Sequence, residues 1–216
     1  PRPEDAIEGE FRAPPAPGQP FRFAFVGDTM APDKAVVLAE MAQAEPDLFL
    51  HGGDIQYQTF PVDTWAGYFV AGDPVHRRAP LHAVIGNHEV EGQDELTELY
   101  EPLLGGAGLP GGTLRWHAFD YGAVRFILLD SETALAGADD PQLAWLDAQL
   151  AEDAASEALK HAVLVFHHPG YTLARHAPNG RVLAHIAPRV QAHGVPLVLT
   201  GHNHGYERFL VEGATW

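Results

Sequence analysis

Five short apolar segments, each followed at once by polar residues, constrain the fold of this chain more than any other feature of its sequence. The segments occupy residues 21–26, 47–50, 81–85, 161–166 and 196–200. Each has the length and apolar character of a buried strand. Helical patterns separate several of them, and strands that alternate with helices are typical of α/β proteins. The sequence therefore predicts an α/β fold in which helices cover a sheet.

The other elements follow from apolar spacing and from proline. Residues 33–44 have a helical pattern, and a second helix is expected to begin at Pro141, because proline suits the first turn of a helix. Residues 181–193 should be helical only as far as Pro188, where an internal proline should end or kink the helix. Two further strands are predicted at residues 123–130 and 208–211.

The N-terminal segment differs in composition from the rest of the chain. Residues 1–20 contain six prolines and are predicted to be extended. No linker-like stretch interrupts the sequence after them, and 46% of the 216 residues are hydrophobic, which is enough to form a core. Residues 21–216 are therefore expected to form a single domain.

The charge balance narrows the range of partners. The formal net charge is −16, and the 13 lysines and arginines are scattered. Because phosphate backbones are bound through basic side chains, neither nucleic acid nor an anionic membrane is expected as a partner. No apolar run reaches the roughly 18 residues of a membrane span. An acidic surface also repels anionic substrates, so a site for such a substrate would need a strongly positive group.

The polar residues that follow the five strands are all of types that bind metals. They are Asp28, Asp54, Asn87, His167, and His202 with His204. Taken singly, an aspartate after glycine is usually a turn or a helix cap, and a lone histidine is more often a hydrogen-bonded structural residue than a ligand. Ligands gather at the carboxyl ends of strands in open α/β sheets, so the joint occurrence predicts a metal site.

The chemistry of this set favours two hard or borderline ions. The sequence contains no cysteine, and carboxylates, an amide and imidazoles suit Fe, Zn, Mn or Mg. The ligands are too many for one ion and about enough for two, with Asp54 placed to bridge. Two-metal sites with ions about 3.5–4 Å apart are common in enzymes that cleave phosphate esters.

The chain resembles the calcineurin-like metallophosphoesterases. Their motifs appear here in the family's order, as GD at 27–28, GGD at 52–54, GNHE at 86–89, HHP at 167–169 and GHNH at 201–204. As a set these motifs are highly specific, and they span most of the chain. The resemblance implies a β-sheet sandwich flanked by helices, with the metal site at the carboxyl ends of the strands.

Tyr57 makes the resemblance more specific. Most of the superfamily has a histidine ligand two residues after the first aspartate, where this chain has Met30. Purple acid phosphatases also lack that histidine and have a tyrosine in a GDxxY motif, which matches Asp54 and Tyr57 here. A tyrosine with an intrinsic pKa of about 10 ionises at neutral pH only beside a strong Lewis acid such as Fe(III). The resemblance thus implies an Fe(III) ligand, whereas the alternative is a ring packed on the sheet edge.

The resemblance also implies how the ligands divide between two ions. The first ion, Fe(III), would take Asp28, Asp54, Tyr57 and His204. The second, a divalent Fe, Zn or Mn ion, would take Asp54, Asn87, His167 and His202. The family's H-x-P pattern favours His167 over His168 as the ligand, and Asp130 and Glu207 are expected to be structural.

Two histidines are the candidate catalytic residues. By the same resemblance His88 would face the phosphate and stabilise its charge or protonate the leaving oxygen. His176 lies roughly where plant-type members carry a second substrate-facing histidine, although an isolated loop histidine can also be plain surface.

The expected reaction is hydrolysis of a small phosphate monoester by attack of a metal-bound hydroxide. A phosphodiesterase with the same centre is an alternative, with residues 55–80 and 170–181 as the loops that set the pocket walls. A non-catalytic module that binds metal and senses a ligand is a second alternative. The sequence does not indicate the physiological substrate or the oligomeric state.

The two ends of the sequence lead to expectations about cellular location and about truncation. No signal peptide is visible, and a secreted or periplasmic location is expected only from family habit and the proline-rich start. The chain stops at Trp216, soon after the last motif, where such domains usually continue with further strands. Truncation at the C-terminus is therefore one expectation.

Overall fold

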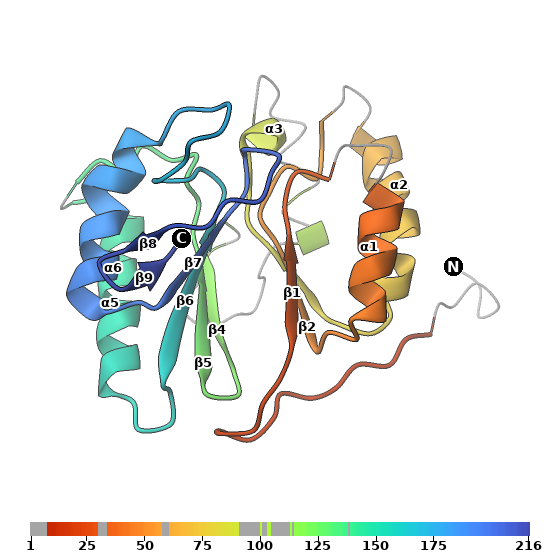
Figure 1. Cartoon of the computed structure of the whole chain (residues 1–216), viewed down its shortest axis with the longest axis horizontal. Coiled ribbons are helices and arrows are strands. Elements are labelled where there is room, and N and C mark those ends of the chain that lie inside the picture. The colour runs from red at the N-terminus through yellow and green to blue at the C-terminus, as the bar shows by residue number, and fades with distance from the viewer. Residues whose placement is uncertain are drawn as a thin grey trace.

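Two β-sheets packed face to face, each covered on its outer side by helices, form the core of the molecule (Figure 1). The computed structural model describes residues 8–29, 34–57, 61–90, 100, 103–104, 113, 115–137 and 139–216. The layers therefore run helix, sheet, sheet, helix. This is the helix-flanked sandwich that the resemblance implies.

The first sheet contains three parallel strands in sequence order. They are β1 (Phe23–Val26), β2 (Leu48–His51) and β3 (Leu81–Ala83). Helices α1 (Lys34–Gln43) and α2 (Pro61–His76) cover the outer face. Successive strand residues point to opposite faces, so Phe49 packs toward Leu38, Trp65 and Tyr68 while Leu50 faces the other sheet.

The second sheet contains six strands in the order β4-β5-β6-β7-β9-β8. Their bounds are β4 His117–Tyr121, β5 Val124–Leu128, β6 His161–Phe166, β7 Leu197–Thr200, β8 Leu210–Val211 and β9 Ala214–Thr215. Strands β5, β6, β7 and β9 are parallel, and β4 and β8 are antiparallel neighbours at the two edges. Helices α5 (Pro141–Ala155) and α6 (Ala187–His193) cover the outer face.

Aliphatic and aromatic side chains fill the space between the sheets. Leu50, Phe126 and Val165 are buried there, and the partly buried Phe23 and Phe119 pack against them. The ring of Phe126 meets Phe23 edge-on, with centroids 5.6 Å apart. Contacts of this kind are strong in sum but weakly directional.

The strand ends that carry the predicted ligands meet at one edge of this sandwich. Strands β1, β2 and β3 in one sheet and β6 and β7 in the other run parallel to their neighbours. Their carboxyl ends lie at the edge marked by the short helix α3 (Asn87–Val90) (Figure 1). The prediction that these polar residues gather at strand ends therefore agrees with the topology.

Three predicted elements differ from the structure. The helix at 181–193 does not end at Pro188, because a π-helical turn at Val182–Ile186 precedes it and the proline falls in the first turn of α6, where no N–H is needed. Residues 61–76, treated as part of a loop, form α2, which tolerates Pro74 near its end. The strand predicted at 208–211 is shorter, Leu210–Val211, and it pairs with β9.

The described part of the N-terminal segment has no helix or strand and is tied to the base of the molecule. Glu10 N–H donates to the Arg77 carbonyl at 2.8 Å, and Arg12 forms an ion pair with Asp47 at 2.9 Å. Met30 lies outside the described residues, as do residues 1–7. Within the residues that the structure describes, no helix is both long enough and apolar enough to cross a membrane.

A histidine pair, with His117 buried and His82 half-buried, lies where β3 and β4 face each other. The rings of His82 and His117 are 5.8 Å apart, and His82 stacks on Phe119 at 3.8 Å. Burial lowers the pKa of both histidines to about 4, and the neighbouring imidazole adds to the shift of His82. The Nε2 atom of His117 has no hydrogen-bond partner among the described residues.

We expect this pair to make the fold sensitive to acid. Between about pH 6.5, the ordinary histidine pKa, and pH 4 the unfolded chain binds more protons than the folded chain, so stability falls as the pH is lowered. His117→Phe should reduce that fall by about 1–3 kcal/mol. Urea unfolding at the two ends of this range measures it, with the exposed His161→Phe as control. An unchanged pH dependence in His117→Phe would contradict the assignment.

Candidate metal centre

The turns that follow the strands hold four predicted ligands in a left-handed backbone conformation. Asp28, Asp54, His202 and His204 have φ angles of 57°, 58°, 74° and 47°. Such angles are uncommon outside glycine and persist where the surrounding structure imposes them, often at functional sites. Here the turns of the two sheets touch, since a Cβ atom at Gly201 would lie 2.7 Å from the Gly52 carbonyl oxygen.

Three residues predicted for the first ion lie together. The Tyr57 hydroxyl donates to Asp28 Oδ1 at 3.0 Å and lies 3.2 Å from His204 Nε2. The same Asp28 oxygen is 3.5 Å from His204 Nε2. The three side chains come from turns after β1, β2 and β7, so residues far apart in sequence share one small region.

The electrostatics of this group keep Tyr57 protonated in the absence of a cation. Burial raises the pKa of Tyr57, and the charges of Asp28 and Asp54 raise it further. Burial also raises the pKa of Asp28, with the charge of Asp54 adding to the rise. A phenol beside two carboxylates can ionise only if a strong positive charge enters the same space.

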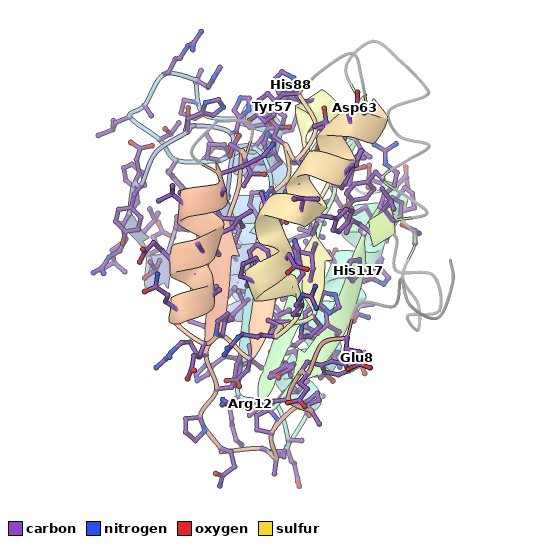
Figure 2. The ribbon with its side chains drawn as sticks, turned by 90° about the vertical axis from the view of Figure 1, so that its right-hand side faces the viewer. Glu8, Arg12, Tyr57, Asp63, His88 and His117 are labelled. Carbon is purple, nitrogen blue, oxygen red and sulfur yellow. The ribbon has the colours of Figure 1, made fainter. Side chains whose placement is uncertain are left out.

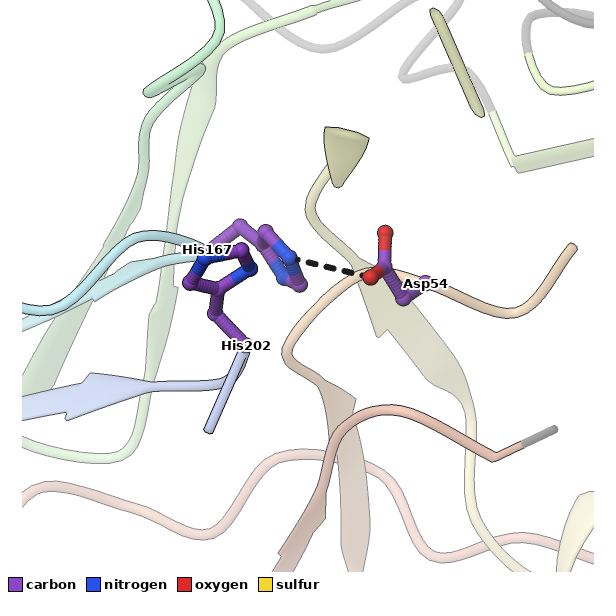
Figure 3. A group of neighbouring side chains, drawn as sticks. All are labelled: Asp54, His167 and His202. Atoms are coloured by element: carbon purple, nitrogen blue, oxygen red, sulfur yellow. Dashed lines mark ion pairs between the residues drawn. The ribbon is translucent and has the colours of Figure 1, made fainter. Parts of the chain in front are cut away.

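The residues predicted for the second ion form an adjoining group. His167 Nε2 lies 3.2 Å from Asp54 Oδ2 (Figure 3). The same nitrogen lies 3.1 Å from Asn87 Oδ1. Asp54, His167 and His202 each offer a ligand atom within 4.8 Å of the other two. Asp54 is 1% exposed and His167 is fully buried, so this group lies deeper than the first.

The orientation of His167 suits a ligand. Its Nδ1 atom lies 2.7 Å from the Gly52 carbonyl oxygen, which can only accept, so Nδ1 carries a proton and Nε2 faces Asp54. Burial opposes a charge on His167, yet the hydrogen bond and charge of Asp54 raise its pKa to about 9. Reciprocally, burial would raise the pKa of Asp54, but His167 holds it below its usual value. His167 Nε2 and Asp54 Oδ2 therefore face each other at 3.2 Å, as two donors to one cation would.

His202 is surrounded by other imidazoles. Its ring centroid lies 4.3 Å from those of His168 and His176 and 5.1 Å from that of His167. Burial, followed by these neighbours, lowers the pKa of His202 to about 3. His202 therefore stays neutral, with a lone pair available for a metal. His168 in turn pairs with Glu132 at 2.8 Å.

The predicted catalytic histidines both lie beside predicted ligands, His88 near Tyr57 and His176 near His202 and His204. His88 N–H donates to Asp54 Oδ1 at 2.9 Å, and the His88 ring lies 4.2 Å from the ring of Tyr57 (Figure 2). His176 lies beside His202, and its N–H donates to Asn203 Oδ1 at 2.8 Å. Sequence reasoning did not single out Asn203, although it lies within the GHNH motif.

Glu89 is a second residue whose role the sequence analysis missed. It is 1% exposed and accepts hydrogen bonds from the backbone N–H groups of Asp54, Ile55, Gln56 and Gly86. Burial raises its pKa to about 7, and the Asp54 charge adds to the rise, while the amide donors oppose it. The only signal in the sequence was its place at the end of GNHE.

The two acids expected to be structural have the contacts of structural residues. Asp130 is fully buried and pairs with Arg115 at 2.6 Å. Glu207 accepts hydrogen bonds from the Thr172 hydroxyl and from Leu173 N–H at 3.0 Å. In the described part of the chain, the contacts of both carboxylates are with loop residues near the centre and not with the predicted ligands.

A cavity of about 630 Å³ adjoins the centre on the side of Asp28 and His204. It runs along β7, and its walls include Phe25, Leu199 and Trp216. Pro169 and Tyr171 line it near the 170–181 loop, whereas no residue of α2 does. Residues 58–60 lie outside the described residues, so the expectation that residues 55–80 set the pocket walls stays a prediction.

The donor set fits metal ions. It combines carboxylates, an amide oxygen, neutral or proton-exchanging imidazoles and a phenol, with no sulfur, and such donors suit Fe, Zn and Mn. The carbonyl partner on Nδ1 of His167 is the outer-shell contact that metal-binding histidines usually make. Asp54 contacts members of both groups and is placed to be shared.

Comparison with known proteins agrees with this geometry. Residues 21–206 match the calcineurin-like phosphoesterase family. The chain belongs to that family. It is 26% identical over 197 residues to "Probable inactive purple acid phosphatase 9" of Arabidopsis thaliana, covering 76% of this chain and 30% of that protein. It is also 26% identical over 219 residues to purple acid phosphatase 22 of the same plant, covering 94% of this chain and 48% of that protein.

A solved structure supports the fold. The purple acid phosphatase isolated from yellow lupin (Lupinus luteus) seeds superposes with a TM-score of 0.69 at 20% identity, over 92% of this chain and 40% of that one. The α/β metallophosphoesterase fold and the likeness to purple acid phosphatases are thereby confirmed. This calcineurin-like phosphoesterase chain spans less than half the length of these relatives.

Proposed function

We propose that the chain is a dinuclear-metal phosphatase of the purple acid type, which hydrolyses small phosphate monoesters. The observation that carries this proposal is the pair of adjoining groups that share Asp54. One contains Asp28, Tyr57 and His204, and the other contains Asn87, His167 and His202. A phenol within hydrogen-bond distance of an aspartate and a histidine is the arrangement that an Fe(III) site with a tyrosine ligand needs.

The residues have separable roles in this proposal. Asp28, Asp54, Tyr57 and His204 would hold Fe(III), while Asp54, Asn87, His167 and His202 would hold a divalent Fe, Zn or Mn ion. When bound, the two ions would neutralise phosphate charge and activate water. They would also supply the positive charge that a protein of net charge −16 otherwise lacks at this site.

The two histidines beside the ligands would handle the proton. The backbone N–H of His88 donates to Asp54 Oδ1, which holds the residue beside the shared aspartate, and its imidazole would face the phosphate and donate a proton to the leaving oxygen. His176, held near His202 through Asn203, would be a second contact to the substrate. A secreted or periplasmic location stays a prediction that cell fractionation would test.

We expect the purified protein to show a broad visible absorption band, and Tyr57→Phe to abolish it. Phenylalanine keeps the ring that contacts His88 and removes only the hydroxyl, so the loss would report the metal–phenolate bond. Tyr206→Phe is the matched control, because Tyr206 is 88% exposed. A colourless protein with full metal occupancy would mean that Tyr57 does not bind Fe(III). Turnover of mono- and diester chromogenic substrates tests the substrate class in the same samples.

A further inference from the structure

We propose that Glu89 is a positioning residue that fixes the distance between the two turns that carry Asp54 and Asn87. This inference rests on the proposed dinuclear centre and assigns a residue that would touch neither ion nor substrate. Glu89 would act through the backbone N–H groups of both turns. By fixing the distance between them, it would set the geometry of the ligands of the second ion.

The contacts of Glu89 reach both turns at once. One carboxylate oxygen accepts from Ile55 N–H and Gln56 N–H, each at 2.8 Å. The other accepts from Asp54 N–H at 2.9 Å and Gly86 N–H at 2.7 Å. Three of these donors belong to the turn after β2, and the fourth belongs to the residue that precedes Asn87. A single side chain therefore links the two turns.

The two turns pack closely at Gly86. A Cβ atom at Gly86 would collide with the Asp54 carboxylate, so the turns are already at their closest approach. His88 N–H completes the connection by donating to Asp54 Oδ1. Removing the acceptor would leave four buried donors unsatisfied, and the turns could relieve this only by moving apart. Asn87 Oδ1 and Asp54 Oδ2 would then no longer face His167 Nε2 together.

Beyond the strands, the described contacts that join these two turns include the four hydrogen bonds to Glu89 and the His88 N–H bond to Asp54. Ordinary sheet hydrogen bonds join β2 to β3, but they end at His51 and Ala83, before the ligands begin. The Val84 N–H bond to the His51 carbonyl is the last main-chain link before the turns. Beyond this bond, the buried carboxylate of Glu89 takes over from the main-chain hydrogen bonds that join β2 to β3. It does so where the two turns diverge to present the predicted ligands.

The test is Glu89→Gln, which keeps the side-chain length and replaces one acceptor oxygen with an NH₂ group that faces N–H donors. We expect the second ion to bind about 10- to 100-fold more weakly, the usual effect of losing an outer-shell partner. The visible band of the Tyr57 site should persist. Metal content per chain at graded concentrations of free Zn²⁺ gives the affinity, and the spectrum reports the first site without any activity assay.

Asp140→Asn is the matched control. Asp140 also accepts three backbone N–H groups, those of Ala136, Gln142 and Leu143, but it caps α5 away from the centre. The Asp140→Asn variant should lose a similar amount of stability and still bind both ions.

Glu89→Asp, whose side chain is one methylene shorter, is the variant to use if Glu89→Gln does not fold. Its carboxylate cannot span both turns, so weaker binding of the second ion is again expected.

The outcomes separate the two proposals. Wild-type protein that binds two ions, together with a Glu89 variant that binds both as tightly, would overturn the positioning role alone. Equal weakening of both ions would also overturn it, because the effect would then lie on Asp54 and not on the distance between the turns. Wild-type protein that binds fewer than two ions and shows no visible band would instead contradict the proposed function.

Discussion

Asp54→Asn is expected to abolish both metal binding at the second site and turnover. Asn has nearly the same shape but no charge, and Asp54 is the residue placed between the two groups. Loss of an outer-shell partner already weakens metal binding about 10- to 100-fold, so loss of the shared ligand should cost more than about 100-fold in turnover. Metal content per chain and turnover of a chromogenic monoester measure the two effects separately.

Asp54→Asn also tests how the charge of Asp54 affects the pKa of His167. Asp54 raises the pKa of His167, so in Asp54→Asn that histidine should titrate at lower pH. Asp147→Asn is a suitable control, because it removes an equivalent charge from the Arg189 ion pair between α5 and α6. Metal content that stayed at the wild-type level in Asp54→Asn would contradict the shared-ligand role.

His88→Ala is expected to lower turnover about 10²- to 10⁴-fold, the usual range for a general acid, while metal content stays unchanged. The backbone N–H that binds Asp54 survives the substitution, so the ligand should keep its place. The loss should be larger for an alkyl phosphate than for a nitrophenyl phosphate, because nitrophenolate leaves without needing a proton. Comparing the two substrates thus separates protonation of the leaving group from charge stabilisation.

A second variant and a control make this prediction sharper. His88→Asn can still donate a hydrogen bond but cannot transfer a proton, so it should resemble His88→Ala with alkyl phosphates and lie closer to wild type with nitrophenyl phosphates. His193→Ala, on the exposed last turn of α6, should change nothing. Unaffected turnover in His88→Ala would show that the assigned role is wrong.

The strands and the gathering of ligands could be predicted because both depend on short-range patterns. Apolar runs bounded by Gly-Asp or His-Pro mark where buried strands stop, and β6 has the predicted bounds, His161–Phe166. Parallel strands place their carboxyl ends at one edge of each sheet, and Asp54 and His167 meet because the two sheets pack with these edges together. The assignment of roles to these residues came from the family resemblance and remains a prediction.

The parts that sequence reasoning missed depend on tertiary context. Helix α2 lies against buried aromatic residues, and its apolar residues show little helical segregation, so its sequence has no clear amphipathic stripe. Pro188 is tolerated because a π-helical turn, Val182–Ile186, precedes it and a new α-helix begins there. In the first turn of that helix the missing proline N–H is not required. Glu89 and Asn203 act on backbone groups that are neighbours only after folding. No spacing along the chain could have indicated those contacts.

The contact between the turns of the two sheets links the geometry of the candidate metal centre to the alignment of the sheets. Asp54 and Asn87 follow strands of the first sheet, and His167 and His202 follow strands of the second. The apolar layer between the sheets resists separation but opposes sliding only weakly, because such contacts have little direction. Hydrogen bonds between the ligand-bearing turns of the two sheets, such as those from His167 to Gly52 and from His202 to Asp28, therefore help to fix how the two layers are aligned. Substitutions between the two sheets, far from any predicted ligand, should accordingly change the geometry of the predicted metal ligands before they change other parts of the molecule.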